Sequence, residues 1–106
     1  MFGIQACQSK KKDNTEQVLR GKKLFKTYCV LCHGEKGDGK GRLAVGKIPP
    51  PANLTISKLT DAAKKKIITG GGESVGRSPF MPPWGQQLSE QEILDLIAYT
   101  NAIKIK

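Results

Sequence analysis

Apolar side chains recur at steps of three and four residues early in the chain, and lysines fill the positions between them. One face of a helix built on this segment gathers Val18, Gly21, Leu24, Phe25 and Tyr28. Because helical residues three and four apart are neighbours, this spacing predicts an amphipathic helix with its lysines toward solvent. Asn14 or Thr15 can cap its N-terminus, and we expect the helix to run to about Cys32.

A second, shorter helix is predicted near the middle of the chain, where the sequence reads DAAKKKIITGGG. Thr60 precedes this segment as a candidate N-cap, and Gly70 would stop the helix. The three consecutive lysines, Lys64 to Lys66, are expected to face solvent because charged side chains are seldom buried.

A last helix is predicted over roughly residues 90–102. Ser89 and Glu92 have the spacing of a capping box at its start. Helical periodicity places four residues on its buried face, namely Ile93, Leu96, Ile97 and Thr100.

Glycine and proline dominate the stretches between these helices. Residues 34–51 contain five glycines and three prolines, and residues 74–85 contain three further prolines. Both residue types disfavour long regular elements, and neither stretch reads as a strand. The pattern therefore predicts an all-α domain of three to four helices with two long loops, and loops of that length usually have a function.

Composition limits the class of protein. A chain of 106 residues is long enough for one domain only, and no apolar run approaches the roughly 18 residues that a spanning helix needs. Six aromatic residues are few for the core of a chain of this size. We therefore expect a bound group to fill part of the interior.

The formal net charge is +9, and the first half of the chain carries most of it. Such an excess attracts acidic partners. A nucleic-acid partner is not expected, because basic and aromatic residues are not interleaved and no binding motif is present.

Cys29, Cys32 and His33 form the pattern C-x-x-C-H, which is the attachment site of a c-type haem. Two thiols three residues apart can reach the two vinyl groups of one porphyrin, while the adjacent imidazole faces the iron. A zinc site would need Cys7 as a fourth ligand from the N-terminal segment. A thioredoxin-like motif would need a strand-helix-strand pattern, which the sequence lacks.

Met81 is the candidate for the sixth ligand of the iron. His33 is the only histidine, which excludes two imidazole ligands from this chain, and Met81 is the only methionine besides Met1. Pro82 disfavours a helical backbone at Met81, so the segment PFMPPW can present a thioether from a stiff, extended loop. The alternative is that Met81 fills a gap in the core.

With these motifs the sequence resembles the class I, single-haem bacterial cytochromes c. The resemblance covers residues 15–102 and includes GKKLFKTYCVLCHGEKGDGKG, IPPPANLT, IITGGG and PFMPPWGQQLSEQEILDLIAYT. It implies a small all-α fold around one covalent haem c, with crossing N- and C-terminal helices in which Gly21 and Phe25 meet Tyr99. It also implies that a carbonyl from Pro49 to Pro51 accepts the Nδ1 hydrogen of His33. Trp84 is expected either to direct its indole N–H toward a haem propionate or to pack as a plain core or lid aromatic.

The resemblance implies a one-electron carrier of a respiratory or related electron-transport chain rather than an enzyme. With His33 and Met81 both bound, the iron would have no open site for oxygen or peroxide. Two alternatives remain at this stage: a haem subunit fixed in a larger redox complex, and a ligand-binding or peroxidase-type haem protein that has lost its methionine ligand. The expected partner is an acidic redox protein, such as an oxidase or reductase subunit, and the chain is expected to act as a monomer or as a subunit of a complex.

Residues 1–13 are expected to form a flexible tail, and residues 14–106 the cytochrome c domain. Haem attachment implies export to the periplasm or cell envelope, yet MFGIQA lacks the charged region and full apolar region of a signal peptide, so we expect the precursor to begin upstream. The sequence I-Q-A-C ending at Cys7 resembles the end of a lipoprotein signal. A lipid on Cys7 would tether the domain to a membrane surface, whereas the alternative is a free thiol in the tail.

Overall fold

The computed structural model describes the backbone of residues 2–105 and the side chains of residues 15–105. Four α-helices follow one another as α1 (Phe2–Tyr28), α2 (Val30–His33), α3 (Asp61–Gly70) and α4 (Glu90–Ala102). Three short 3₁₀ turns, η1 (Arg42–Ala44), η2 (Leu54–Ile56) and η3 (Glu73–Val75), lie in the connecting loops. Within residues 2–105 there is no strand, and the all-α prediction is confirmed.

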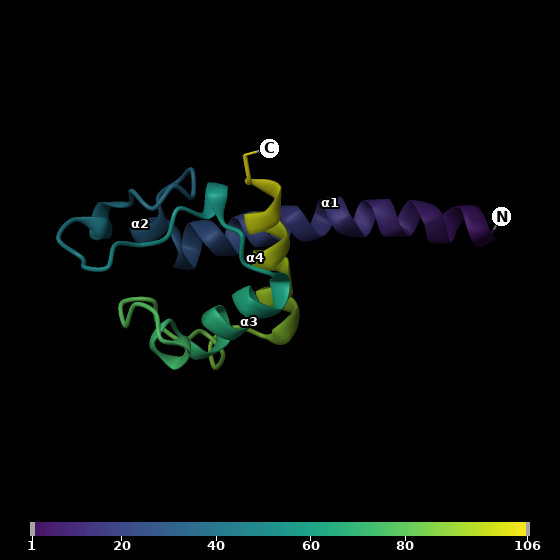
Figure 1. Cartoon of the computed structure of the whole chain (residues 1–106). Helices are drawn as coiled ribbons and strands as arrows, with labels where there is room; N and C mark the ends of the chain where they lie inside the picture. The colour runs from purple at the N-terminus through teal and green to yellow at the C-terminus, as the bar shows by residue number, and fades with distance from the viewer. Residues whose placement is uncertain (1, 106) are drawn as a thin grey trace.

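Helices α1 and α4 cross at a point that a glycine makes possible (Figure 1). A Cβ atom on Gly21 would collide with the backbone carbonyl of Asp95 and lie 2.8 Å from Cβ of Tyr99. One turn further along α1, the Phe25 ring packs against the Tyr99 ring with centroids 5.2 Å apart. The expected meeting of Gly21, Phe25 and Tyr99 is therefore confirmed.

The hydrophobic core lies along this crossing. Its buried apolar residues are Phe25, Leu88, Ile93, Leu96, Ile97 and Tyr99. Each fully buried side chain of this size contributes about 1.5–3 kcal/mol, so the α1–α4 contact is the main source of stability in the protein itself.

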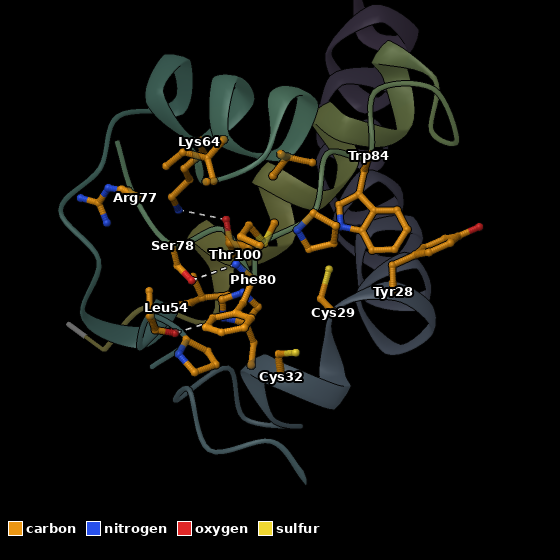
Figure 2. A pocket seen from close by; sticks show the side chains of 18 of the residues that line it. Tyr28, Cys29, Cys32, Leu54, Lys64, Arg77, Ser78, Phe80, Trp84 and Thr100 are labelled. Carbon is orange, nitrogen blue, oxygen red and sulfur yellow. Dashed lines mark hydrogen bonds between the residues drawn. The ribbon is translucent and has the colours of Figure 1, made fainter. Parts of the chain in front are cut away.

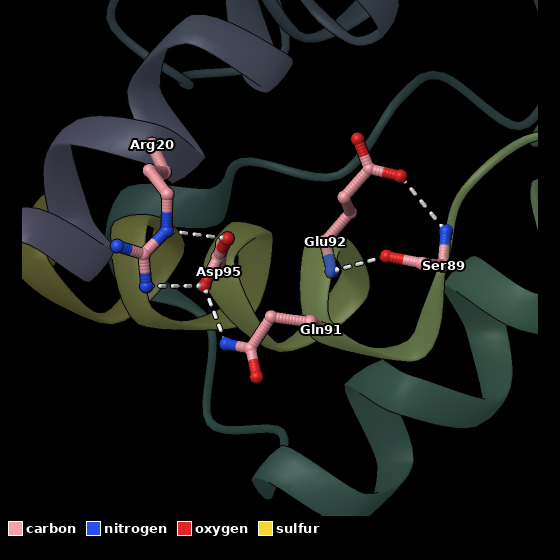
Figure 3. A network of polar contacts seen from close by, with 5 residues as sticks. All are labelled: Arg20, Ser89, Gln91, Glu92 and Asp95. Atoms are coloured by element: carbon pink, nitrogen blue, oxygen red, sulfur yellow. Dashed lines mark hydrogen bonds and ion pairs between the residues drawn. The ribbon is translucent and has the colours of Figure 1, made fainter.

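A polar contact joins the same two helices (Figure 3). Asp95 is buried in α4, and its carboxylate accepts hydrogen bonds from Arg20 Nε at 3.0 Å and from Gln91 Nε2 at 2.9 Å. Burial by itself would raise the pKa of Asp95, but these hydrogen bonds and the charge of Arg20 outweigh burial and lower it. The sequence analysis missed Asp95 as a buried residue.

The start of α4 follows the predicted capping box (Figure 3). Ser89 Oγ accepts from the Glu92 N–H at 3.1 Å, and the Glu92 carboxylate accepts from the Ser89 N–H at 2.9 Å. These bonds satisfy two backbone donors that a helix start otherwise leaves unpaired.

Helix α3 also begins as predicted, with Thr60 accepting from the Ala63 N–H at 3.1 Å. The expectation that Lys64 faces solvent is wrong, because this residue is only 5% exposed. Lys64 precedes Ile67 and Ile68 by three and four positions, so all three project from one helix face, and that face points inward.

Helix α1 begins at Phe2, well before the cap expected at Asn14 or Thr15. The expected start is wrong because residues 4–13 contain no glycine or proline and include Ala, Gln and Lys, which favour helix. The side chains of residues 1–14, including Cys7, lie outside the described part of the chain. The tether role of this segment stays a prediction. No helix among the described residues is long and apolar enough to cross a membrane.

Candidate cofactor site

A cavity of about 500 Å³ opens between the end of α1, α2, the inner face of α3, α4 and both long loops (Figure 2). Its walls are mainly apolar, with contributions from residues as far apart as Phe25 and Thr100. This size is within the ordinary range of cofactor sites. The bound group that the sparse aromatic core suggested therefore has a matching space.

The two cysteines of the C-x-x-C-H motif enter this cavity from neighbouring positions. Cys29 lies between α1 and α2, and Cys32 lies one turn later in α2. Both cysteines are half-buried. Before a haem is attached, burial and the proximity of Cys32 raise the pKa of the Cys29 thiol to about 12.

His33 is oriented by the loop that follows α2. Its Nδ1 lies 3.1 Å from the carbonyl oxygen of Ala52, and a carbonyl can only accept, so Nδ1 carries the hydrogen. The Nε2 lone pair is then available to a metal, which is how a second partner fixes a histidine ligand. Burial lowers the pKa of His33, partly opposed by the Ala52 carbonyl, and this keeps the imidazole neutral.

The acceptor is Ala52, so the expectation of a carbonyl from Pro49 to Pro51 is wrong by one residue. The reason is that backbone hydrogen bonds anchor the loop after α2 to itself and to His33. Leu54 N donates to the Gly37 carbonyl at 2.6 Å, and Gly39 N donates to the His33 carbonyl at 2.8 Å. These bonds fix the backbone on both sides of the imidazole and bring the Ala52 carbonyl to Nδ1.

Met81 lines the same cavity as His33. Its backbone is held at both ends, since its carbonyl accepts from Gly72 N at 3.0 Å and its N–H donates to the Ser78 carbonyl at 3.4 Å. The structure thus brings together all four residues predicted for the cofactor: Cys29, Cys32, His33 and Met81. Which of them bind iron stays a prediction.

Trp84 packs on the wall next to Cys29 (Figure 2). Its indole ring contacts the Tyr28 ring with centroids 5.1 Å apart, and its backbone N–H donates to the Ile68 carbonyl at 2.8 Å. These contacts fit the expected packing of Trp84 as a core or lid aromatic. The propionate role of its indole N–H stays a prediction.

Two residues of the site were missed by sequence reasoning. Ala52 acts through its backbone carbonyl, for which a sequence contains no signal. The burial of Lys64 could have been predicted, because its spacing from Ile67 and Ile68 places it on their helix face. The adjacent lysines instead suggested that the whole run faces solvent. Among the side chains of residues 15–105, no group of three or more His, Cys, Asp or Glu is arranged to hold a metal ion.

Residues 16–99 match the family described as cytochrome c oxidase, cbb3-type, subunit III. The chain belongs to this family. Among curated proteins it is 30% identical over 90 residues to the cbb3-type cytochrome c oxidase subunit FixP of Azorhizobium caulinodans and 28% identical over 94 residues to subunit CcoP of Azospirillum brasilense. These alignments cover 85% and 88% of this chain but 28% and 30% of those proteins, so the chain spans less than a third of their length.

A solved structure supports the same conclusion. A chain of the reducing HAO-like protein complex of Kuenenia stuttgartiensis superposes with a TM-score of 0.66 at 29% identity, covering 80% of this chain and 41% of that one. The chain is therefore a cytochrome c domain that carries electrons by means of a covalent haem c, and its relatives are subunits of redox complexes. Cytochrome c domains of this family lie in the periplasm or cell envelope.

The residues of the cavity fit that cofactor. Two thiols and a neutral imidazole with a fixed ring lie at one wall, and a thioether lines the same space. Most of the remaining wall is apolar, as a porphyrin plane requires.

Proposed function

We propose that the domain transfers single electrons with its iron bound by His33 and Met81 as axial ligands. The observation that supports this most directly is that both side chains line one cavity, together with the two attachment cysteines. When bound, the haem iron supplies a couple between ferric and ferrous states.

The protein groups have separate tasks in this proposal. The Ala52 carbonyl holds the His33 ring in one tautomer, so that Nε2 would be the atom that binds the iron. Met81 supplies a soft sulfur, which favours the ferrous state, from a backbone anchored to Gly72. With His33 and Met81 both bound, the iron would have no open site for oxygen or peroxide, and electron transfer would need no acid or base.

We further propose that the domain works within, or docks onto, a larger respiratory redox complex. This is supported by relatives that are subunits of cbb3-type oxidases. Leu31 and Leu43 line the cavity and are 43% and 48% exposed, so an apolar edge of the cavity faces solvent. Lys36 and Lys40 are exposed in the loop between them, which suits an acidic redox partner.

A lipid at Cys7 would hold such a domain at the cell-envelope membrane, and the basic residues Lys10 to Lys12 would strengthen that contact at an anionic surface. Mass spectrometry of the native protein tests this. An N-terminal peptide that begins at acylated Cys7 supports the anchor, and an unmodified Cys7 with upstream residues attached rejects it.

The axial ligands are tested with Met81→Ala in the haem-loaded protein. We expect covalent haem to be retained while the ferric spectrum changes from low-spin to high-spin or water-bound. Cyanide and imidazole should then bind at least tenfold faster than to the parent, because the sixth position no longer has to be vacated.

Val75→Ala is a matched control, because Val75 is exposed in the same loop and does not line the cavity. It should leave the spectrum and the ligand kinetics unchanged. Parent-like behaviour of Met81→Ala would reject Met81 as a ligand. A high-spin ferric parent would favour the ligand-binding or peroxidase-type alternative.

A further inference from the structure

Lys64 is a buried cation in the wall of the haem cavity. It is 5% exposed and projects from the inner face of α3 beside Ile67 and Ile68 (Figure 2). Its neighbours in sequence differ, since the Lys65 side chain is 43% exposed and pairs with Glu90 on the outside of the helix. Burying an ammonium is costly, so we expect the Lys64 ammonium to have a partner of opposite charge.

Among the described residues, the acceptors of Lys64 are neutral. Nζ donates to Thr100 Oγ1 at 2.9 Å and to Asn101 Oδ1 at 2.8 Å. An ammonium has three hydrogens, so one remains for another acceptor. Among the side chains of residues 15–105, no carboxylate lies within ion-pair distance of Nζ.

The nearest charged groups do not neutralise this cation. Asp61 lies on the same helix, but its carboxylate accepts from Asn101 Nδ2 at 2.9 Å rather than from Lys64. Burial and the positive charge of Lys104 lower the pKa of Lys64, and the charge of Asp61 only partly opposes them. Lys47 and Arg77, the other cations of the cavity wall, add charge of the same sign.

Haem c brings two carboxylates of its own. Its vinyl-derived thioethers are on one edge of the porphyrin, and its propionates are on the opposite edge. The propionates therefore belong on the side of the cavity away from Cys29 and Cys32. Figure 2 shows Lys64 on the far side of the view from these two cysteines, with Thr100 between them.

We propose that Lys64 binds a haem propionate, with Thr100 and Asn101 holding its ammonium toward that carboxylate. The assignment rests on the haem c of the domain. It does not depend on Met81 being the sixth ligand, so the two can fail separately. Lys64 would then set the reduction potential, because a fixed positive charge at a propionate disfavours the additional charge of the ferric state.

The proposal is tested by measuring the reduction potential of haem-loaded variants against pH. Lys64→Gln keeps a side chain that can hydrogen-bond to Thr100 and Asn101 but removes the charge. We expect the equilibrium constant for reduction to fall about tenfold at neutral pH, which is a shift of about 59 mV for a one-electron couple. The propionate of this variant has lost its cation, so its pKa rises, and the potential should fall with pH through the acid-to-neutral range.

Two further variants separate pairing from general effects of charge. Lys65→Gln removes the same formal charge from the outer face of the same helix and should leave the potential near that of the parent. Lys64→Arg keeps the charge and should restore most of the potential. Identical potential-against-pH curves for Lys64→Gln and Lys65→Gln would overturn the proposal.

An experimental structure of the haem-loaded parent tests the contact between Lys64 and a propionate directly. This test does not depend on the folding of any variant. A propionate oxygen within about 4 Å of Lys64 Nζ, the limit of an ion pair, supports the assignment. Both propionates bound elsewhere, with Lys64 still donating only to Thr100 and Asn101, would reject it.

Discussion

The α1–α4 crossing and the loop wall of the cavity are built on different principles. At the crossing, the side chains of two long helices interlock, with buried apolar residues on both sides of Gly21 and a buried Asp95 held by Arg20. The wall opposite is formed by residues 34–60 and 71–87, which are held mostly by isolated backbone hydrogen bonds such as Leu54 N to Gly37 O.

This difference separates stability from function. Side-chain packing at the crossing supplies the burial that holds the domain together. The loop wall instead places the Ala52 carbonyl at Nδ1 of His33 and Met81 in the lining of the cavity. Changes at the crossing should therefore alter the unfolding free energy, whereas changes in the wall should alter the haem environment.

The largest effect is expected from Gly21→Val. The new side chain would collide with the Asp95 carbonyl and with Tyr99, so α4 would have to move away from α1. We expect a loss of about 2–4 kcal/mol in unfolding free energy, measured by guanidinium denaturation of the haem-loaded protein. Lys23→Ala, on the exposed face of α1, should change it by less than about 0.5 kcal/mol. Equal stability of these two variants would show that the crossing is not closely packed.

The next effect concerns pH and Asp95. Its folded pKa lies below the value in the unfolded chain, so the stability it contributes is present above the unfolded value of about 3.9 and is lost as pH falls through the folded pKa. We expect Asp95→Asn to be about 1–3 kcal/mol less stable than the parent at neutral pH, with a smaller further loss below about pH 4.

Glu90→Gln is the control for acid unfolding. The Glu90 carboxylate is exposed, and the hydrogen bond and charge of Lys65 lower its pKa without burial. Its removal should change the pH profile much less than Asp95→Asn does. If both variants show the same acid unfolding curve, the buried pair is not a source of acid sensitivity.

The helical half of the fold was predictable from sequence because its signals are local. The period of Val18, Gly21 and Phe25, and the caps at Thr60 and Ser89, each depend on residues within one or two turns. The C-x-x-C-H motif identified three of the four predicted cofactor residues in the same way. The start of α1 was missed because polar residues without a periodic apolar face can still be helical when they favour helix locally.

The polar details of the site needed three-dimensional information. Ala52, nineteen positions after His33 in the sequence, holds it by a backbone group that any amino acid could supply. Burial of Lys64 and Asp95 depends on acceptors and donors from another helix, namely Thr100 for the first and Arg20 for the second. Sequence patterns report which side chains are charged, but not whether a partner elsewhere permits their burial.

A smaller effect compares two caps, one in each region. Asn53→Ala removes the oxygen that accepts from Thr55 in the loop wall, and Ser89→Ala removes the cap of α4. Each should cost about 1 kcal/mol of unfolding free energy. Only Asn53→Ala should also change the haem absorption spectrum, because it loosens the backbone next to Ala52. Equal spectra for both variants would contradict the separation of the two regions.

The smallest effect on the protein itself is expected from exposed lysines, whose proposed role is in docking. Replacing Lys22, Lys26 and Lys36 by Glu should leave the unfolding midpoint nearly unchanged, because all three are exposed. Association with an acidic redox partner should slow strongly at low salt. The difference should shrink at about 0.1 M salt and above, where charges further apart than about 10 Å are screened. Stopped-flow kinetics of electron transfer to the redox partner, repeated across a salt series, measure the association rate. Lys58→Glu is the single-site control, because Lys58 is exposed and does not line the cavity. If the triple variant associates at the parent's rate at every salt concentration, these lysines do not steer the partner. That result would not change the roles assigned to the crossing and the loop wall.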